Sequence, residues 1–420
     1  MQTYDVVVLG AGPAGLAAGI AANENGASVL IIERESKPGG ILKQCIHDGF
    51  GLIRFGEKLT GPEYAQRYVK MVREQDIMVM TSTFVLKVEK DSEDFVLKIL
   101  NSQNGVFNIC SKALILANGC RERTVKQVGI HGTRPAGVLT AGTAQRFVNI
   151  EGFLPCKKCV ILGSGDIGLI MARRLTLEGA KVEGVYEAKA EPSGLSRNIA
   201  QCLDDFSIPL HLSSTVTKIF GSDRVEAVEI SQVDGNMNPI LGTERVVECD
   251  GLILSVGLIP ENEIAQSLGL SLDPATKGPR VDQNFMTEMD GVFLCGNALH
   301  VSDLVDYVSE SGEYAGKAAA GYTRAKKLRT LVPVVSSQAS FIYAVPQYIN
   351  LSSQNLRPTL YFRSRGIVNN KRVQVKCGET MLFDKKYSKL KPPEMERINF
   401  DIASLTAGQA TRFSITMTDG

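Results

Sequence analysis

Two segments of this chain repeat one glycine-rich pattern in the same local setting. The apolar residues 6–9 lead into a G-x-G-x-x-G motif at 10–15, and the apolar residues 160–162 lead into a second at 163–168. In both, a small residue, a glycine and a valine follow at the same distances, and a glutamate closes the segment. This order predicts a buried strand, a tight turn, a helix and a second strand. A chain of 420 residues with two such units is expected to be an α/β protein with two Rossmann-like domains.

The residue types in these motifs suit a dinucleotide. The first glycine permits a sharp turn, the second lets a pyrophosphate approach the backbone, and the third lets the helix pack closely on the strand. The phosphates then lie at the positive N-terminus of the helix. Glu33 and Glu187, at the ends of the second strands, are expected to accept hydrogen bonds from a ribose. One motif alone is weak evidence, but two complete units predict two dinucleotide sites.

The two glutamates differ in their spacing from the glycines. Glu33 follows the last shared glycine of its repeat by seven residues, whereas Glu187 follows its own by eight and Tyr186 holds the seventh place. One residue of slip turns a strand side chain to the opposite face, so Glu187 reaches a ribose only if the strand end is bulged. Neither acidic place holds an arginine for a 2′-phosphate, which favours NAD(H) over NADP(H). Lys189 keeps NADP(H) open.

Three more apolar segments end at glycine turns, at residues 112–119, 250–257 and 291–297. With the two repeats, they resemble the FAD- and NAD(P)-dependent pyridine nucleotide-disulfide oxidoreductase superfamily over about residues 1–330. In that superfamily the first motif binds FAD and the inserted one binds the nicotinamide cofactor. The resemblance therefore implies a FAD-dependent NAD(P)H oxidoreductase with FAD and NAD(H) as cofactors.

The resemblance carries over to individual positions. Residues 117–119 stand where the superfamily has an alanine-threonine-glycine turn, and residues 296–297 stand where it has the glycine-aspartate that holds the ribityl chain. The expected FAD site comprises Gly10, Gly12, Ala14, Gly15, Glu33, Arg34, Gly40, Val85, Ala117, Asn118, Gly119, Gly296 and Asn297. The expected NAD(H) site comprises Gly163, Gly165, Asp166, Ile167, Gly168, Glu187 and Gly257.

Four loops, at residues 39–55, 59–64, 134–143 and 296–307, resemble a narrower group. They look like the flavoprotein encoded beside an anaerobic-type glycerol-3-phosphate dehydrogenase, and are similar to FAD/NAD subunits of opine, sarcosine and proline dehydrogenases. The resemblance implies a subunit that moves electrons between NAD(H) and a partner dehydrogenase, in glycerol 3-phosphate oxidation. The resemblance also implies a small companion protein as a further partner.

Two alternatives stay open at this point. Cys45 and His47 lie in the loop after Gly39 and Gly40 and are candidate catalytic residues beside a flavin. A lone thiol there could serve a self-contained NADH oxidase, peroxidase or disulfide reductase. A disulfide reductase needs a second cysteine a few residues on, and none follows Cys45 here. A structural role for Cys45 is the more common case. A non-enzymatic protein with a structural or sensing FAD is the other alternative.

The pair Cys156 and Cys159 is a C-x-x-C motif, but it leads directly into the predicted strand at 160–162. Cys159 is therefore expected to belong to that strand, and a redox role for the pair is disfavoured. No second C-x-x-C motif occurs, so the sequence predicts neither zinc nor an iron–sulfur cluster. His300 lies beside a flavin motif and is a candidate proton relay.

Charge, cysteine content and hydropathy limit the partners and the compartment that we expect for the protein. Lys plus Arg is 46 and Asp plus Glu is 45, so the chain has no electrostatic footprint for nucleic acid. The nine scattered cysteines do not form a secreted disulfide framework, which favours the cytoplasm. The apolar stretch at residues 6–22 contains too many glycines for a membrane-spanning helix.

The expected organisation is two nested Rossmann-like domains and a small C-terminal β-rich module. FAD would bind residues 1–122 and 263–330, NAD(H) would bind the inserted 123–262, and the module would span 331–420. Its strands are predicted at 359–363, 372–376 and 400–402. With 12 basic and 6 acidic residues, it is a candidate docking surface, although a solvated face explains such a bias more often. Before it, Ser302 is expected to cap a helix that starts near Asp303.

Overall fold

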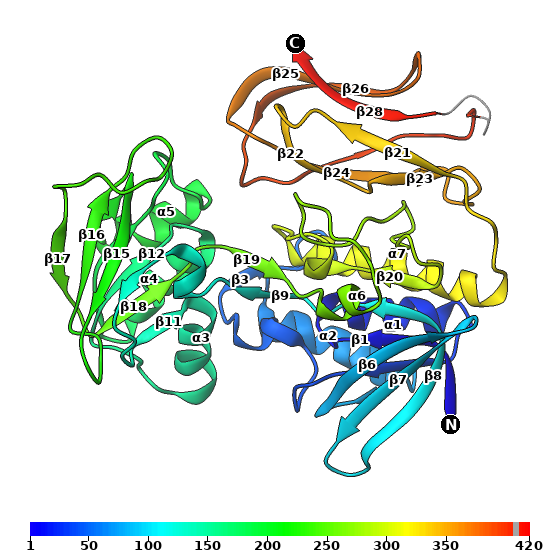
Figure 1. Cartoon of the computed structure of the whole chain (residues 1–420), viewed down its shortest axis with the longest axis horizontal. Coiled ribbons are helices and arrows are strands. Elements are labelled where there is room, and N and C mark those ends of the chain that lie inside the picture. The colour runs from blue at the N-terminus through cyan, green and yellow to red at the C-terminus, as the bar shows by residue number, and fades with distance from the viewer. Residues whose placement is uncertain (406–410) are drawn as a thin grey trace. The chain divides into compact units, whose positions relative to one another are not determined.

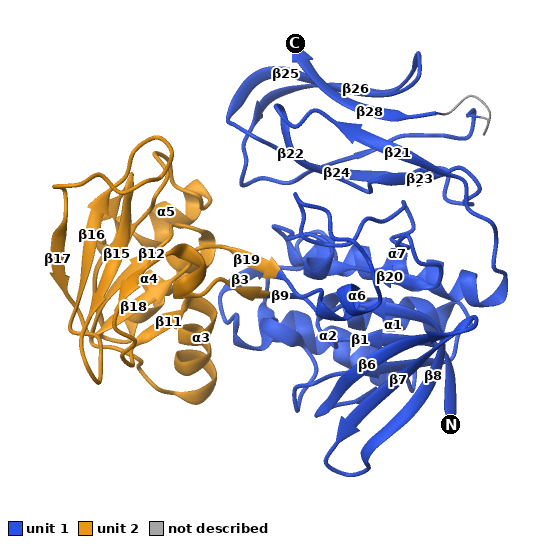
Figure 2. Ribbon diagram, in the orientation of Figure 1, with its two compact units in different colours: residues 1–120, 260–420 blue, residues 121–259 orange. Residues whose placement is uncertain are grey.

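The computed structural model describes residues 1–405 and 411–420. The chain divides into two compact units, Met1–Cys120 with Pro260–Gly420, and Arg121–Ile259 (Figure 2). The second unit is thus inserted into the first, and the chain crosses between them in β9 (Cys120–Glu122) and β19 (Leu258–Pro260), which pair with each other. The expected α/β class with nested domains is confirmed. The finer breaks after residues 122, 262 and 330 stay a prediction.

The first unit is built on a parallel sheet in the order β5-β2-β1-β8, with β20 paired to β8. Figure 1 labels β1, β8 and β20 of this sheet. Its central strands are almost fully buried, as is usual for parallel strands, whose two faces both pack against other parts of the protein. In its first part, residues 105–111, β8 also pairs antiparallel with β7, which pairs with β6. The strands are β1 (Gln2–Leu9), β2 (Val29–Ile32), β5 (Met78–Met80), β6 (Thr83–Asp91), β7 (Asp94–Asn101), β8 (Gly105–Leu116) and β20 (Val292–Leu294).

Helices α1 and α7 pack backbone to backbone in this unit. A Cβ atom on Gly312 of α7 would overlap the carbonyl oxygen of Ala14, and one on Gly316 would overlap that of Ala18. Only glycine allows this approach. The other elements here are α1 (Pro13–Glu24), η1 (Gly40–Gln44), β3 (Asp48–Phe50), β4 (Leu59–Thr60), α2 (Gly61–Glu74), α6 (Glu263–Ser267), η5 (Gly296–Ala298) and α7 (Val305–Arg324).

The start of α7 corrects a prediction. The helix begins at Val305 with Leu304 as its N-cap residue, and no side chain caps it. Ser302 instead donates its backbone N–H to Asn297 Oδ1, at 3.1 Å. Asp303 is held by contacts outside the helix, so the loop stays extended for two residues more than the sequence indicates.

The second unit holds a five-stranded parallel sheet in the order β11-β18-β12-β13-β14 and a separate sheet in the order β10-β15-β16-β17. Cys159 lies in β12, as predicted. The strands are β10 (His131–Gly132), β11 (Val138–Thr140), β12 (Lys158–Leu162), β13 (Lys181–Tyr186), β14 (Leu210–His211), β15 (Ser214–Phe220), β16 (Ala227–Gln232), β17 (Arg245–Glu248) and β18 (Gly251–Leu254). The helices are η2 (Val125–Val128), α3 (Ala141–Arg146), η3 (Phe147–Glu151), α4 (Asp166–Leu177), α5 (Ser196–Cys202) and η4 (Asp204–Phe206).

The C-terminal region is β-rich, as predicted, and its two sheets enclose one apolar core. The sheet orders are β23-β21-β28-β25-β26 and β22-β24-β27. The bounds are β21 (Leu331–Ser336), β22 (Phe341–Val345), β23 (Tyr348–Asn350), β24 (Thr359–Ser364), β25 (Val368–Cys377), β26 (Thr380–Leu390), β27 (Glu396–Asn399) and β28 (Phe413–Asp419). The strands predicted at 359–363 and 372–376 are confirmed.

The strand predicted at 400–402 is wrong, because β27 ends at Asn399. Phe400 N still reaches Pro358 O, at 3.4 Å, but Pro358 has no N–H with which to continue the ladder. Phe400 and Ile402 are nevertheless buried in the core of the region. The apolar pattern therefore indicated burial correctly and the strand incorrectly.

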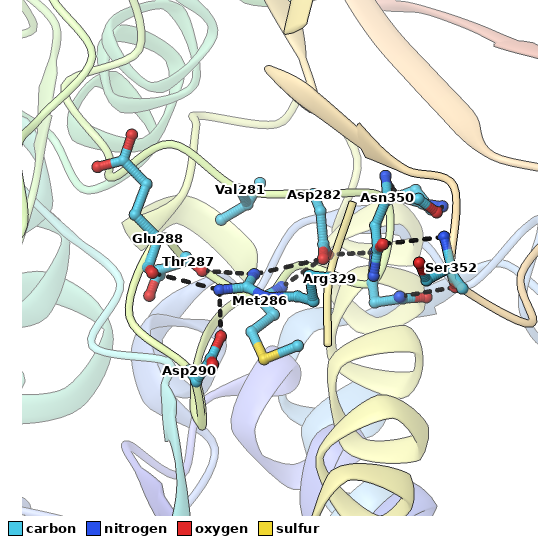
Figure 3. Close-up of polar contacts among 12 residues, drawn as sticks. Val281, Asp282, Met286, Thr287, Glu288, Asp290, Arg329, Asn350 and Ser352 are labelled. Atoms are coloured by element: carbon cyan, nitrogen blue, oxygen red, sulfur yellow. Dashed lines mark hydrogen bonds and ion pairs between the residues drawn. The ribbon is translucent and has the colours of Figure 1, made fainter. Parts of the chain in front are cut away.

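Arg329, which directly precedes the C-terminal region, binds the loop of residues 282–290 of the first unit (Figure 3). Its buried guanidinium lies 3.5 Å from the Asp282 carboxylate, 2.5 Å from that of Asp290 and 2.8 Å from the carbonyl oxygen of Thr287. Four residues of the C-terminal region also belong to the main core of the first unit, namely Tyr343, Val345, Tyr361 and Met395. The region is an integral part of its unit.

Candidate functional site

The first glycine motif separates what the fold needs from what it leaves open. Gly10 has φ +107°, and a Cβ atom there would lie 2.5 Å from the carbonyl oxygen of Ala117. A Cβ atom on Gly15 would overlap the carbonyl oxygen of Gly10. On Gly12, by contrast, the nearest atom would be Gly40 Cα, at 4.0 Å. Protein packing requires the first and third glycines, and the second leaves space at the N-terminus of α1 for a ligand's phosphates.

The second motif repeats this arrangement in the other unit. A Cβ atom on Gly163 would overlap Ser255 O, and one on Gly168 would lie 2.5 Å from Gly163 O. A Cβ atom on Gly165 would meet nothing closer than Ser255 Oγ, at 3.8 Å. Both units therefore have the same open space, or cradle, at the N-terminus of the motif helix. The space is open because the second glycine of the motif has no side chain to fill it.

Glu33 is buried at the end of β2 and binds the turn of the first motif. Its carboxylate accepts hydrogen bonds from Ala11 N, at 2.7 Å, and from Glu35 N, at 2.8 Å. A carboxylate has about four acceptor positions, so it can still accept the hydroxyls of a ribose.

Glu187 occupies the equivalent place, in spite of its different spacing. Its carboxylate accepts hydrogen bonds from Ser164 N and Lys189 N, each at 3.1 Å. The register between β12 and β13 skips Glu183, so β13 is bulged there. The extra residue restores the face on which Glu187 points, although the bulge lies earlier in the strand than its end.

The remaining FAD candidates lie around the first motif in the first unit. Asn118 Oδ1 is buried and has no hydrogen-bond partner among residues 1–405 and 411–420, which suits a bound polar group. A Cβ atom on Gly296 would lie 2.8 Å from Ala14 Cβ. Arg34 is exposed and pairs with Glu261, at 3.2 Å. Val85 lies in β6, where it packs against the apolar core of the first unit.

The remaining NAD(H) candidates have partners within the protein. Asp166 Oδ1 accepts hydrogen bonds from Leu195 N, at 2.9 Å, and Asn198 Nδ2, at 2.7 Å, so this carboxylate holds α5 in place. Ile167 packs against the apolar core of the second unit. Gly257 has φ +101° and accepts the backbone N–H of Arg123, at 3.1 Å.

Comparison with known proteins identifies the family to which this chain belongs. The family model described as pyridine nucleotide-disulphide oxidoreductase matches residues 4–321. The chain belongs to this family. The family uses FAD and NAD(P)H, and the open cradles at Gly12 and Gly165 and the Asn118 oxygen, which has no partner among the described residues, fit two such dinucleotides.

The chain is similar to the HcnB component of hydrogen cyanide synthase from Pseudomonas protegens, at 29% identity over 64% of this chain and 60% of that protein. It is similar to an opine oxidase subunit from Rhizobium meliloti, at 24% identity over 71% of this chain and 67% of that protein. The chain spans about 60% of the length of the HcnB relatives. The crystal structure of T. acidophilum thioredoxin reductase shares the fold, with a TM-score of 0.64 and 21% identity over 77% of this chain and all of that one.

The candidate thiol of Cys45 is sealed in the first unit. Its side chain is buried, and Sγ lies 3.4 Å from the carbonyl oxygen of Ile41. Burial raises the pKa of the Cys45 thiol to about 12, so it is protonated at neutral pH. His47 is partly exposed, with its ring 5.0 Å from that of Phe50.

The Cys156 and Cys159 pair is buried in the second unit. A hydrogen bond with Cys156 and burial raise the pKa of the Cys159 thiol well above its usual range. A Cβ atom on Gly251 would lie 3.1 Å from Cys156 Sγ, so the pair fills the space beside β18. Within residues 1–405 and 411–420, no cluster of His, Cys, Asp and Glu could hold a metal ion, and no helix is long and apolar enough to cross a membrane.

The sequence does not indicate the side chains that the C-terminal region contributes near the Gly296-Asn297 turn, namely Tyr343, Tyr361 and Arg363. His300 is buried against the rings of Tyr343 and Tyr361, each 5.5 Å away. Burial and the Arg363 guanidinium lower the pKa of His300 to about 4, so its imidazole is neutral at physiological pH and a poor proton donor. These partners lie more than 40 residues from His300 in sequence, and no local pattern indicates them.

Proposed function

We propose that this chain is the flavin subunit of a larger oxidoreductase and moves electrons between NAD(H) and a partner dehydrogenase. The observation that carries this proposal is the combination of two open dinucleotide cradles with a sealed Cys45. The thiol of Cys45, the candidate electron carrier, is buried and protonated, so a partner is the simplest acceptor or donor.

In this proposal the first unit holds FAD and the second holds NAD(H). When bound, FAD would supply hydride exchange with the nicotinamide ring and electron exchange with the partner. The chain itself supplies position: Gly12 and the N-terminus of α1 receive the FAD pyrophosphate, and Glu33 accepts from the adenosine ribose. Gly165 and Glu187 do the same for NAD(H), and the other residues of the two expected sites complete them.

The preference for NAD(H) over NADP(H) is part of the proposal. Glu187 is buried and its negative charge would repel a 2′-phosphate. The Lys189 ammonium, which could receive such a phosphate, lies 3.3 Å from Ser193 Oγ instead.

The partner is proposed from the relatives and from the loops that resemble the glycerol-3-phosphate dehydrogenase flavoprotein. HcnB and the opine oxidase relative are by their names components of larger enzymes. We therefore infer a separate dehydrogenase that oxidises glycerol 3-phosphate, with a small companion protein, in the cytoplasm. All nine cysteines lie among the described residues and none forms a disulfide, which supports a reducing compartment.

Anaerobic titration of the purified yellow protein tests the proposal. NADH should bleach the flavin faster than NADPH and should support steady reduction of an artificial dye, and Cys45→Ser should leave both rates unchanged. Faster bleaching by NADPH would contradict the cofactor assignment. If Cys45→Ser instead abolished a disulfide reductase or peroxidase activity of the isolated chain, the thiol-based alternative would hold.

A further inference from the structure

The loop of residues 297–304 links the proposed FAD residue Asn297 to α7, and the C-terminal region holds this loop in place. Within the loop, Asn297 Oδ1 accepts the backbone N–H of Ser302, at 3.1 Å. The position of the Asn297 side chain therefore depends on the path of the residues that follow it. That path is fixed from outside, by Arg363 of β24.

Arg363 is buried, with 13% of its side chain exposed, and all five of its N–H donors have an acceptor. The acceptors are Tyr343 Oη (2.9 Å), Pro392 O (3.1 Å), Pro393 O, Val301 O (3.2 Å) and Asp303 Oδ1. Two of these acceptors belong to the loop and three to the C-terminal region. A lysine has only three donors and no planar fork, so it cannot replace these contacts.

Two further contacts hold the same loop. The second carboxylate oxygen of Asp303 accepts the backbone N–H of Met395. The buried ring of His300 lies between Tyr343 and Tyr361 of the C-terminal region. The loop is thus fixed at His300, at Val301 and at Asp303 by residues that lie at least 43 positions away in the sequence.

We propose that Arg363 is a positioning residue for the flavin, and that the C-terminal region completes the FAD site by holding the loop of residues 297–304. This inference rests on the proposed placement of FAD in the first unit. It gives residues 331–420 a role inside the flavin site, in addition to any role as a docking surface. Removal of the Arg363 guanidinium takes a donor from Val301 O and from Asp303, and the loop that orients Asn297 becomes free to move.

The rate at which the holoprotein releases FAD tests this role. After dilution of the purified protein, the fluorescence of free flavin, excited with visible light that protein side chains do not absorb, rises as FAD dissociates. Arg363→Gln should release FAD about tenfold faster or more, and Arg363→Lys should lie between it and the unaltered protein. The visible absorption bands of the bound flavin should shift as its surroundings change.

The matched control is Arg372→Gln, because Arg372 pairs with Asp384 within the same region, at 2.7 Å, and is more exposed. It should release FAD at the unaltered rate. If Arg363→Gln does not fold, Asp303→Asn replaces it, since it removes only the charge of an exposed loop residue and should still speed release. Folded variants at Arg363 or Asp303 that release FAD at the unaltered rate would overturn the inference.

A third variant separates this inference from the assignment on which it rests. Gly12→Val fills the proposed pyrophosphate cradle directly and should abolish FAD binding. If Gly12→Val retains FAD, the placement of FAD itself is wrong. If it loses FAD while Arg363→Gln behaves like the unaltered protein, only the role of Arg363 fails.

Discussion

At the scale of single residues, the glycine motifs distinguish structural from ligand-facing positions. A side chain at Gly10 or Gly15 would meet main-chain atoms, so these glycines serve the fold whether or not a cofactor binds. Gly12 and Gly165 have open space beside them, so the fold alone does not explain why they lack a side chain. The pyrophosphate of a dinucleotide explains it.

This difference yields a pair of matched substitutions. Gly12→Val should fold but lose FAD, with occupancy lower by about tenfold or more, because the side chain occupies the cradle. Gly165→Val should stay yellow and lose its anaerobic bleaching by NADH. Visible absorbance of the purified proteins and the bleaching rate measure both. If both variants kept both properties, the two assignments would be wrong.

Cys45 gives a second prediction at this scale. Because burial raises its pKa to about 12, its thiolate population at neutral pH is roughly a thousandfold below that of an ordinary cysteine. Iodoacetamide should therefore leave Cys45 unmodified in the native protein and alkylate it after unfolding, as mass spectrometry of the peptides can show. Rapid alkylation of native Cys45 with loss of activity would favour a thiol-based reaction.

At the scale of elements, the contact of α1 with α7 places the N-terminus of the first motif helix against the region of Gly296 and Asn297. The sequence predicts both helices, but it does not indicate that they touch through glycine. Gly312 and Gly321 look equivalent in the sequence of α7, yet of these two only Gly312 lies against α1.

Gly312→Ala should lower the free energy of unfolding by about 1–3 kcal/mol or more, because its methyl group overlaps the Ala14 carbonyl oxygen. Gly321→Ala is the matched control, since nothing lies within 4 Å of its Cβ position. It should raise stability by about 0.5–1 kcal/mol through its better helix propensity. Thermal unfolding of both variants decides this, and equal effects would contradict the packing of α1 on α7.

Much of the fold could be predicted from sequence because its signals are local. A tight turn needs glycine at a positive φ, and a buried parallel strand needs a run of apolar residues, so Gly10, Gly163 and the strands around them are readable. The bulge at Glu183 has only an indirect signal in the sequence, which is the one extra residue between Gly179 and Glu187 compared with the first repeat. The start of α7 and the end of β27 depend on Asp303 and Pro358 and their partners, which are distant in sequence, and both predictions were wrong.

At the scale of the whole molecule, one unit is inserted into the other, and the C-terminal region belongs to the first unit. Arg363 joins that region to Val301 and Asp303, which follow the proposed flavin residue Asn297. Deletion of residues 331–420 would therefore damage the FAD site as well as any docking surface. A partner interface on this region is better tested by substitution of exposed residues such as Lys385 and Lys389, which should weaken coupling to a partner and leave dye reduction intact.

The most direct test of electron transfer to a partner is a reconstitution assay. Formation of NADH from NAD with glycerol 3-phosphate as the reductant is followed with the isolated chain, with a separate glycerol-3-phosphate dehydrogenase protein, and with both. The account predicts dye reduction by NADH with the isolated chain, and NADH formation from glycerol 3-phosphate only when both are present. NADH formation from glycerol 3-phosphate by the isolated chain would contradict it.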